Sequence, residues 1–327
     1  MVSLFKEEEL AARFDDKIEP FWNDKVTTGQ FVGKHDVPVH YAWCVPPQAE
    51  HSVLISSGRI ESLLKYKEVV FDLYQQGFAV FIFDHRGQGL SGRMTDNPHH
   101  GYVVSFTDYV EDLLAFCSSV VRPNQRGPLN LLCHSMGSAI GALAILRQPD
   151  WFHKAVFCSP MFGIRPALPA LLAKSLLWLG KCRDTRAGLL TDYFFGQQDY
   201  QAIPFAANKL THSYMRYTLF RQIYDAQPQI QLGGVTTDWL AAAHDAMAII
   251  EHQAHQLNLP CLIFSAGADK VVDNRAQARI ARHIPDCHWV EIDGAAHELL
   301  IEADQYREPV MQQLCAFMLA DSHKTCP

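Results

Sequence analysis

One serine, one aspartate and one histidine stand where an acyl-transfer reaction could use them. Ser135 lies in "LLCHSMGSAI", directly after an apolar run and before a stretch of small residues. Asp269 follows "CLIFSA", and His297 follows "HWVEI" in "DGAAHELL". A serine hydroxyl attacks an ester when a base removes its proton and an acid orients that base. The order serine, acid, histidine predicts Ser135 as nucleophile, His297 as base and Asp269 as the orienting acid.

The residues around Ser135 depart from the pattern Gly-x-Ser-x-Gly, because Cys133 replaces the first glycine. The local letters alone leave two interpretations, a nucleophile on a sharp strand-to-helix turn or a serine that caps the next helix. Cys133 is small, so we expect a modest crowding cost that does not prevent the turn. The interpretation as a nucleophile is favoured because Asp269 and His297, each just past a later strand, could supply the acid and the base that it needs.

Two main-chain amides are candidates for stabilising the oxyanion. The Met136 N–H opens the helix after the serine, and the Arg59 N–H lies in "SGRIES", after an earlier strand. The Arg59 side chain leaves two interpretations, contact with a phosphate or carboxylate, or a solvated arginine paired with Glu61. Asp273 precedes "NRAQARIARHI", so it fits a helix cap better than the catalytic acid.

The elements that must position these residues are apolar strands alternating with helical segments. The expected strands are residues 52–57, 79–84, 129–133, 154–159, 260–266 and 288–292, with an antiparallel pair before them at 26–45. Strands of this kind between helices predict an α/β fold, in which helices flank both faces of a mostly parallel central sheet.

The alternation stops between residues 160 and 236, where no clear strand occurs. We therefore expect a core made of residues 1–159 and 237–327 and a helical cap inserted at 160–236. Residues 168–180 are apolar nearly all round, which suits a packed cap helix. The alternative is the wall of an acyl-chain site or an entrance that faces a membrane.

The loop "DHRGQGLSG" (84–92) contains Gly87, Gly89 and Gly92 at the spacing of a dinucleotide fingerprint. No helix opens after it, because "RMTDNPHH" follows, so a structural loop is the better interpretation and a nucleotide-dependent reductase the weaker one. His99 and His100 are adjacent and join no metal-binding pattern. No cofactor and no metal are therefore expected.

The composition of the chain indicates which binding partners and which cell compartment are compatible with it. The chain has 327 residues and a formal net charge of −7, which argues against nucleic acid. Nine scattered cysteines, an acidic start without a signal peptide and no run of 18 apolar residues predict a cytoplasmic protein with reduced thiols. Peripheral contact at the inner membrane and the oligomeric state are left open.

The motifs together resemble the α/β-hydrolase superfamily, and within it the monoacylglycerol lipase/lysophospholipase branch, with its bacterial lysophospholipases nearest. The resemblance runs from about residue 52 to 300 through "SSGRIES", "FDHRGQGLSGR", "FTDYVEDL", "CHSMGSAI", "GADKVVDN" and "GAAHEL". "DHRGQGLSG" is widespread in the superfamily, whereas "GRIES" is more particular to the bacterial lysophospholipases. Related lipases have His-Gly where this chain has Ser57 and Gly58, a change that keeps the Arg59 amide. The bacterial lysophospholipases resembled tolerate a small residue such as Cys133.

The resemblance implies a serine hydrolase that cleaves the acyl ester of lysophospholipids through an acyl-enzyme. Monoacylglycerol lipase or general carboxylesterase activity is the second expectation, and acyl transfer to another alcohol is an allied one. Nucleophilic-aspartate chemistry is disfavoured because serine occupies the elbow. A non-catalytic lipid-binding protein of the same fold is the alternative of another class.

Overall fold

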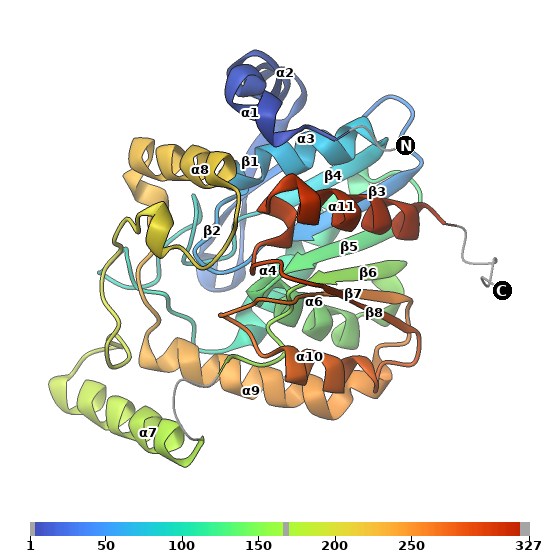
Figure 1. Cartoon of the computed structure of the whole chain (residues 1–327). Helices are drawn as coiled ribbons and strands as arrows, with labels where there is room; N and C mark the ends of the chain where they lie inside the picture. The colour runs from blue at the N-terminus through green and yellow to red at the C-terminus, as the bar shows by residue number, and fades with distance from the viewer. Residues whose placement is uncertain (1–3, 166–169, 321–327) are drawn as a thin grey trace.

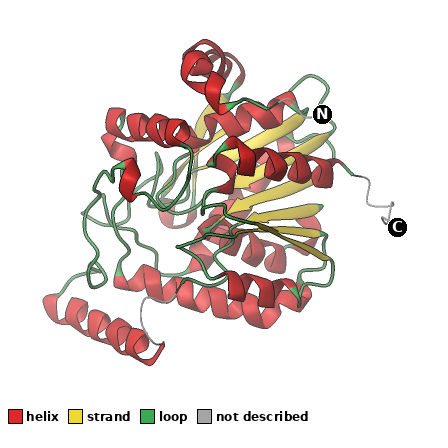
Figure 2. Cartoon of the chain, viewed as in Figure 1, coloured by secondary structure: helices red, strands yellow, loops and turns green. Residues whose placement is uncertain are grey.

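An eight-stranded sheet between two layers of helices forms the centre of the molecule in a computed structural model of the chain, which describes residues 4–165 and 170–320 (Figures 1 and 2). The strands are β1 Thr27–Val32, β2 Pro38–Cys44, β3 His51–Ser56, β4 Phe78–Phe83, β5 Leu129–His134, β6 Lys154–Cys158, β7 Cys261–Ala266 and β8 Cys287–Ile292. Their spatial order is β1-β2-β4-β3-β5-β6-β7-β8. β1 and β2 are antiparallel and the six later strands are parallel, which confirms the predicted α/β fold.

The near-continuous apolar strands are explained by helices on both faces of the sheet. Every residue of β4, β5 and β7 is buried. One face is covered by α3 Lys67–Gln75 and α11 Asp304–Leu319 (Figure 1). The other face is covered by α4 Phe106–Phe116, α6 Met136–Arg147, α9 Thr237–Gln253 and α10 Asn274–Ala281. Because the parallel strands end at one edge of the sheet, the loops after β3, β5, β7 and β8 meet there.

Two short helices before the sheet, α1 Glu7–Arg13 and α2 Glu19–Lys25, were not anticipated from the sequence. The buried aromatic side chains of Phe21 and Trp22 pack α2 against the same apolar cluster as α3. Leu10, Phe14, Ile18, Phe21 and Trp22 recur at the three- to four-residue spacing of an amphipathic helix, so the sequence did carry a signal for these helices.

The segment between β6 and α9, residues 160–236, carries α7 Ala170–Ala187 and α8 Tyr214–Ala226, both on the left in Figure 1. In its described part, 160–165 and 170–236, the only β-pairing is by isolated bridges, such as Ile164 with Val272. The expected absence of a strand thus holds for these residues. The boundaries of a cap at 160 and 236 stay a prediction.

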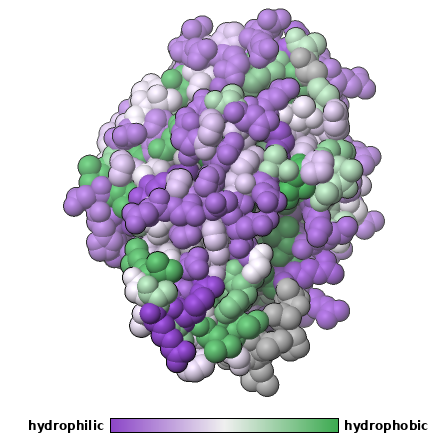
Figure 3. Space-filling model, turned by 90° about the vertical axis from the view of Figure 1, so that its left-hand side faces the viewer, coloured by the Kyte–Doolittle hydropathy of each residue, from purple (hydrophilic) through white to green (hydrophobic). Residues whose placement is uncertain are grey.

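The apolar stretch 168–180 falls only partly within the described residues. Residues 168 and 169 lie outside them. The rest belongs to α7, where Trp178 is 66% exposed and Leu179 is 46% exposed. These two side chains are therefore not packed inside a cap. Figure 3 shows the face of the molecule that carries α7 and α8, with apolar areas among hydrophilic ones.

No helix within residues 4–165 and 170–320 combines the length and the hydropathy that crossing a bilayer requires. The eight cysteines of these ranges are free thiols, and six of them are buried.

Candidate active site

Ser135 lies on a sharp turn between β5 and α6. Its backbone has φ 49° and ψ −117°, a conformation that costs on the order of 1–3 kcal/mol for a non-glycine residue and that the surroundings must enforce. The Ser135 N–H donates to the carbonyl of Cys158 on β6 at 3.0 Å. The Ser135 side chain makes no capping hydrogen bond to α6. The interpretation as a helix cap is therefore wrong for this residue.

Small residues on α6 allow the turn. A Cβ on Gly137 would lie 2.0 Å from the carbonyl oxygen of Ser56 on β3, so no side chain fits there. A Cβ on Gly141 would lie 2.5 Å from the sulfur of Cys133. The Cys133 side chain, which stands where the usual motif has glycine, thus occupies the space that Gly141 leaves free because it has no side chain. This explains why Cys133 is compatible with the turn.

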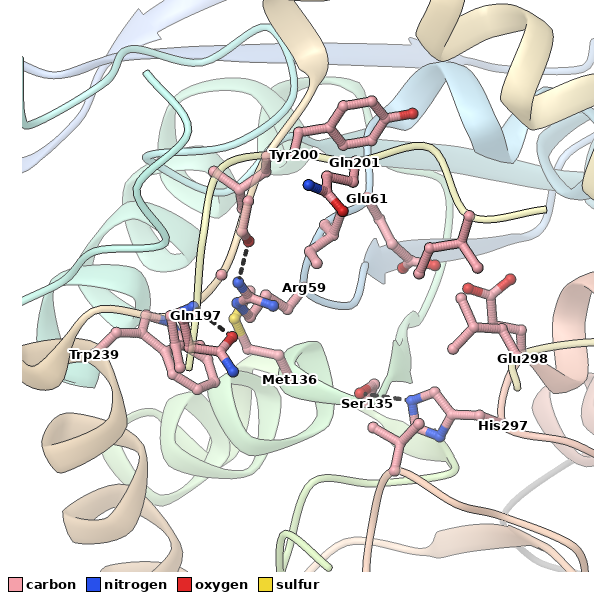
Figure 4. A pocket seen from close by; sticks show the side chains of 18 of the residues that line it. Arg59, Glu61, Ser135, Met136, Gln197, Tyr200, Gln201, Trp239, His297 and Glu298 are labelled. Atoms are coloured by element: carbon pink, nitrogen blue, oxygen red, sulfur yellow. Dashed lines mark hydrogen bonds between the residues drawn. The ribbon is translucent and has the colours of Figure 1, made fainter. Parts of the chain in front are cut away.

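The structure brings Ser135, His297 and Asp269 together at the carboxyl edge of the sheet. His297 Nε2 lies 3.0 Å from Ser135 Oγ, and His297 Nδ1 lies 2.7 Å from Asp269 Oδ2 (Figure 4). All three residues are buried. The arrangement lets the histidine take a proton from the serine while the carboxylate orients the ring.

Asp269 is held as an anion by its surroundings. Its second oxygen accepts from the N–H groups of Val271 and Val272 at 2.7 and 3.1 Å. Burial alone would raise the pKa of Asp269, but the hydrogen bonds and the charge interaction with His297 lower it below its ordinary value. Asp273, the other aspartate of this loop, accepts from the Arg275 N–H at 3.0 Å and caps α10, as expected.

The two amides expected to stabilise an oxyanion lie on the same pocket as Ser135. Met136 is the first residue of α6, so its N–H has no partner within the helix. The Arg59 N–H donates to no acceptor among the described residues. The residue that follows Arg59, Ile60, has φ 61°, an outlier for a β-branched side chain. Tyr224 OH donates to the Ile60 carbonyl and holds this strained loop.

The loop 84–92, which resembled a dinucleotide fingerprint, instead supports the Arg59 loop. Gln88 Nε2 donates to the carbonyl oxygens of Gly58 at 2.7 Å and Glu61 at 3.0 Å. Carbonyl and N–H of one trans peptide point in opposite directions, so holding the Gly58 carbonyl orients the Arg59 N–H. Asp84 accepts from the Leu63 N–H at 2.6 Å. The loop is structural, and its glutamine positions a candidate oxyanion donor.

A pocket of about 550 Å³ opens above the serine. Ser135 and His297 line it together with Arg59, Met136 and Trp239. Residues 160–236 contribute further side chains, such as Tyr200 and Phe220. Most of the lining is apolar, and the volume suits a flexible ligand of drug size or larger.

A buried charge cluster, made of Glu61, Lys65 and Glu298, lines one side of the pocket. Glu61 was expected as a possible partner of Arg59 and pairs with Lys65 instead, whereas Lys65 and Glu298 were not expected at the site. Lys65 Nζ donates to Glu61 at 2.8 Å and to Glu298 at 2.6 Å. Burial alone would raise the pKa of Glu61, but Lys65 and His134 lower it to about 2. Burial raises the pKa of Glu298. Lys65 lies four residues after Glu61 on the chain, a spacing that could have signalled the first pair.

His134, the neighbour of the serine, was also not singled out. Its ring centroid lies 4.9 Å from that of His297. Burial lowers the pKa of His134 to about 4, so the ring is neutral at pH 7. A neutral ring at this position adds no charge that would oppose an imidazolium at His297.

Comparisons with known proteins give the family and the relatives of this chain. Residues 47–304 match the family model described as serine aminopeptidase, S33. The chain is 36% identical to lysophospholipase L2 of Escherichia coli strain K12, over 95% of this chain and 93% of that protein. It is 25% identical to the monoglyceride lipase of Rattus norvegicus over 80% of each chain. A solved monoglyceride lipase from Saccharomyces cerevisiae shares the fold, with a TM-score of 0.67, 16% identity and coverage of 92% and 96%.

Proposed function

The chain belongs to the serine aminopeptidase S33 family of hydrolases, and we propose that it is a lysophospholipase that cleaves its substrate through an acyl-serine intermediate. The similarity to lysophospholipase L2 over nearly the whole length of both chains supports the substrate class. The observation that carries the chemistry is the hydrogen-bonded series Ser135–His297–Asp269, whose serine and histidine line the pocket.

In the first half of the reaction, Ser135 Oγ attacks the ester carbonyl carbon while His297 Nε2 takes the hydroxyl proton. Asp269 keeps the ring in the tautomer that has its free lone pair on Nε2, and it stabilises the imidazolium that forms. The amides of Met136 and Arg59 donate to the oxyanion. Collapse of the tetrahedral intermediate breaks the ester C–O bond, and His297 returns its proton to the departing glycerol oxygen.

In the second half, water takes the place of the departed alcohol. His297 removes a proton from the water, whose oxygen attacks the acyl carbon, and the same two amides stabilise the second oxyanion. Cleavage of the acyl–Ser135 bond releases the fatty acid, and the proton on His297 returns to Ser135 Oγ. Acyl transfer would follow the same steps with another alcohol in place of water.

Residues 160–236 are proposed as the cap over this site. Side chains from both this segment and the core line the pocket, including Tyr200 and Phe220 from the cap and Trp239 from the core. The exposed Trp178 and Leu179 on α7 support peripheral contact of a cytoplasmic enzyme with a membrane surface. Sedimentation with anionic vesicles tests that contact: a double change of these residues to serine is expected to lower the bound fraction.

The test of the function is a substrate panel at equal acyl chain. Purified protein is assayed on lysophosphatidylethanolamine, lysophosphatidylcholine, monoolein and p-nitrophenyl esters, with Ser135→Ala as control. The expected result is the highest kcat/KM on a lysophospholipid and none above background for Ser135→Ala. Activity on short soluble esters alone would contradict the lipid assignment.

Monoacylglycerol lipase activity is the second candidate, supported by the rat relative and the mostly apolar pocket lining. A higher kcat/KM on monoolein than on both lysophospholipids would favour it. A fluorophosphonate probe separates either enzyme from a non-catalytic lipid-binding protein. The enzyme is expected to be labelled at Ser135 when folded, and absence of labelling would support the binding protein.

A further inference from the structure

The Arg59 guanidinium lies in the pocket with few partners from the protein (Figure 4). Its Nη2 donates to the carbonyl of Gly233 at 2.5 Å, and the group lies 5.4 Å from the centre of the Trp239 ring. Its Nε is buried without a hydrogen-bond partner, and Nη1 bonds to no described residue. An arginine has five N–H donors, so most of its capacity is unused here.

No carboxylate balances this cation. In the described ranges, no acidic oxygen lies within 4.0 Å of the Arg59 guanidinium, and Glu61, two residues on, is already bonded to Lys65. Burial lowers the pKa of Arg59 to about 10, and only the tyrosines Tyr109 and Tyr193 act against that shift. A desolvated cation without a counter-ion is costly, and that cost is recovered when an anion binds.

We propose that the Arg59 guanidinium binds the phosphate of the substrate's head group and so separates phosphate-bearing monoacyl lipids from neutral ones. This inference rests on the proposed function. A planar guanidinium matches two phosphate oxygens at once, and this geometry also favours phosphate over a single hydroxyl. The head group of a monoacylglycerol offers only a hydroxyl at that place.

The position of Arg59 suits phosphate binding because its main-chain N–H and its side chain can contact two groups of one lipid, the ester carbonyl and the phosphate. The Arg59 N–H is a proposed oxyanion donor, so it fixes where the ester carbonyl lies. In a lysophospholipid the phosphate is attached to the same three-carbon glycerol as the ester. When the Arg59 amide holds the ester carbonyl, the phosphate is therefore a fixed number of bonds away, and the side chain of the same residue extends toward it.

A second pocket arginine, Arg221 on α8, offers a matched control. Its guanidinium lies 5.0 Å from the ring centres of Tyr217 and Phe220, and its Nη1 donates to Tyr200 at 3.1 Å. Rings thus occupy its faces, and a hydroxyl uses one of its donors. Arg221 has the same charge, lines the same pocket and, like Arg59, has a buried Nε without a hydrogen-bond partner. It differs because the four rings of Tyr200, Tyr217, Phe220 and Tyr224 surround its guanidinium within 6.0 Å, so the protein already covers its faces.

The experiment compares Arg59→Gln, Arg59→Lys and Arg221→Gln with the wild type. The kcat/KM is measured on lysophosphatidylethanolamine and on a monoacylglycerol of the same chain. The main-chain amide of residue 59 stays in every variant, so the ratio of the two values is the readout. We expect Arg59→Gln to lower the ratio about 10- to 100-fold and Arg59→Lys by less, because hydrogen bonds to charged groups are the strong ones. Arg221→Gln is expected to leave the ratio within about threefold.

Binding on an inactive background tests the same site without turnover. Ser135→Ala and Ser135→Ala/Arg59→Gln are titrated with lysophosphatidylethanolamine and with inorganic phosphate, and thermal unfolding shows that both are folded. A head-group site predicts weaker lipid binding in the double variant. Weaker binding of inorganic phosphate alone would instead assign Arg59 to a free anion and overturn the head-group proposal.

Failure of this inference differs from failure of the function. Equal losses on both lipids in Arg59→Gln, or a lower ratio in Arg221→Gln only, would overturn the role of Arg59 while lysophospholipase activity stands. A wild type that hydrolyses no lysophospholipid would overturn the function. In that case equal lipid binding by Ser135→Ala and the double variant would also overturn the site.

Discussion

Arg59 and Glu61 are two residues apart in one loop and line one pocket, but the protein treats their charges differently. The Glu61 carboxylate accepts from the Gly58 N–H at 2.5 Å, from Lys65 at 2.8 Å and from Tyr66 at 2.6 Å. The Arg59 guanidinium has one carbonyl partner. Glu61 is therefore a structural charge, whereas Arg59 has donors left for a ligand.

The difference teaches which changes should damage the protein and which should change its selectivity. Groups bonded on all sides, such as Glu61 and the triad, hold the site in place, so their loss affects every substrate. A group with free donors acts only when a ligand brings the complementary charge. Changes to the groups that hold the site in place are therefore expected to affect activity or stability on every substrate, from the triad, with the largest effect, to Cys133, with the smallest.

The triad should show the largest effect, because its members act as one unit. We expect His297→Ala and Ser135→Ala each to lower kcat by about 10⁴-fold or more, and the double variant to lose little beyond either single change. Steady-state rates on a lysophospholipid measure this. His212→Ala is the control, since the His212 ring pairs with Glu302 at 2.6 Å and bonds to no serine among the described residues. Retention of a tenth of the activity by His297→Ala would contradict the assignment.

Glu61 should show its effect in stability and in its dependence on pH. The folded pKa of about 2 lies below the ordinary value of 4.5, so the stabilisation is present above pH 4.5 and is lost as the pH falls toward 2. We expect Glu61→Gln to be less stable by about 3 kcal/mol at pH 7. Denaturant unfolding should show this gap narrowing between pH 4.5 and 2.5.

Glu251→Gln serves as the control for Glu61. Its partner is Arg279 at 2.6 Å, but both side chains are about half exposed. An exposed pair contributes about 0–1 kcal/mol, so little change is expected. A constant gap between wild type and Glu61→Gln across the pH range would show that Glu61 is not a structural anion.

Gln88 should affect the rate more than binding, because it orients the Arg59 amide. We expect Gln88→Leu to lower kcat about 10- to 100-fold with a smaller change in KM, the pattern of a lost transition-state interaction. Ser91→Ala is the control from the same loop. Ser91 bonds to Asp84 at 2.7 Å and to His40 at 2.9 Å, so its loss should lower stability and not kcat. A change in KM alone for Gln88→Leu would argue against positioning.

Cys133 should show the smallest effect. Cys133→Gly is expected to keep kcat within about threefold of the wild type and to lower the free energy of unfolding by about 1–2 kcal/mol, because a buried side chain is removed beside Gly141. Cys133→Ala keeps the Cβ and should lose less. Folded but inactive Cys133→Gly protein would show that the thiol itself takes part in the turn.

Most of the fold could be predicted from the chain because its strands are apolar on both faces. The six parallel strands and the antiparallel pair lie within a few residues of the expected ranges. The helices α1 and α2 were not predicted, although Leu10, Phe14 and Ile18 recur at helical spacing, and in the structure α1 contacts α8 and α2 contacts α3. The local pattern was insufficient for α7, where the apolar residues left open a packed cap helix, an acyl-chain wall or an entrance that faces a membrane, and Trp178 and Leu179 are exposed.

The candidate triad was predictable because each member follows a recognisable strand, and the carboxyl ends of parallel strands meet at one edge. The roles of Gln88, Lys65 and Glu298 were not. Lys65 reaches Glu298 across 233 positions in the chain, and Gln88 reaches Gly58 from another strand's loop. Such contacts leave no periodic signal in the sequence.

The sequence by itself determined which residues could do chemistry and in what order their strands deliver them, because residue type and hydrophobic period are local properties. Only the tertiary structure decided which charged side chains are paired with other groups of the protein. Glu61 and Arg59 are both charged residues, and the sequence is compatible with an ion pair between them. Lys65, Tyr66 and the Gly58 amide surround the carboxylate, whereas no described acid approaches the guanidinium. That difference comes from three-dimensional proximity, which no local pattern encodes.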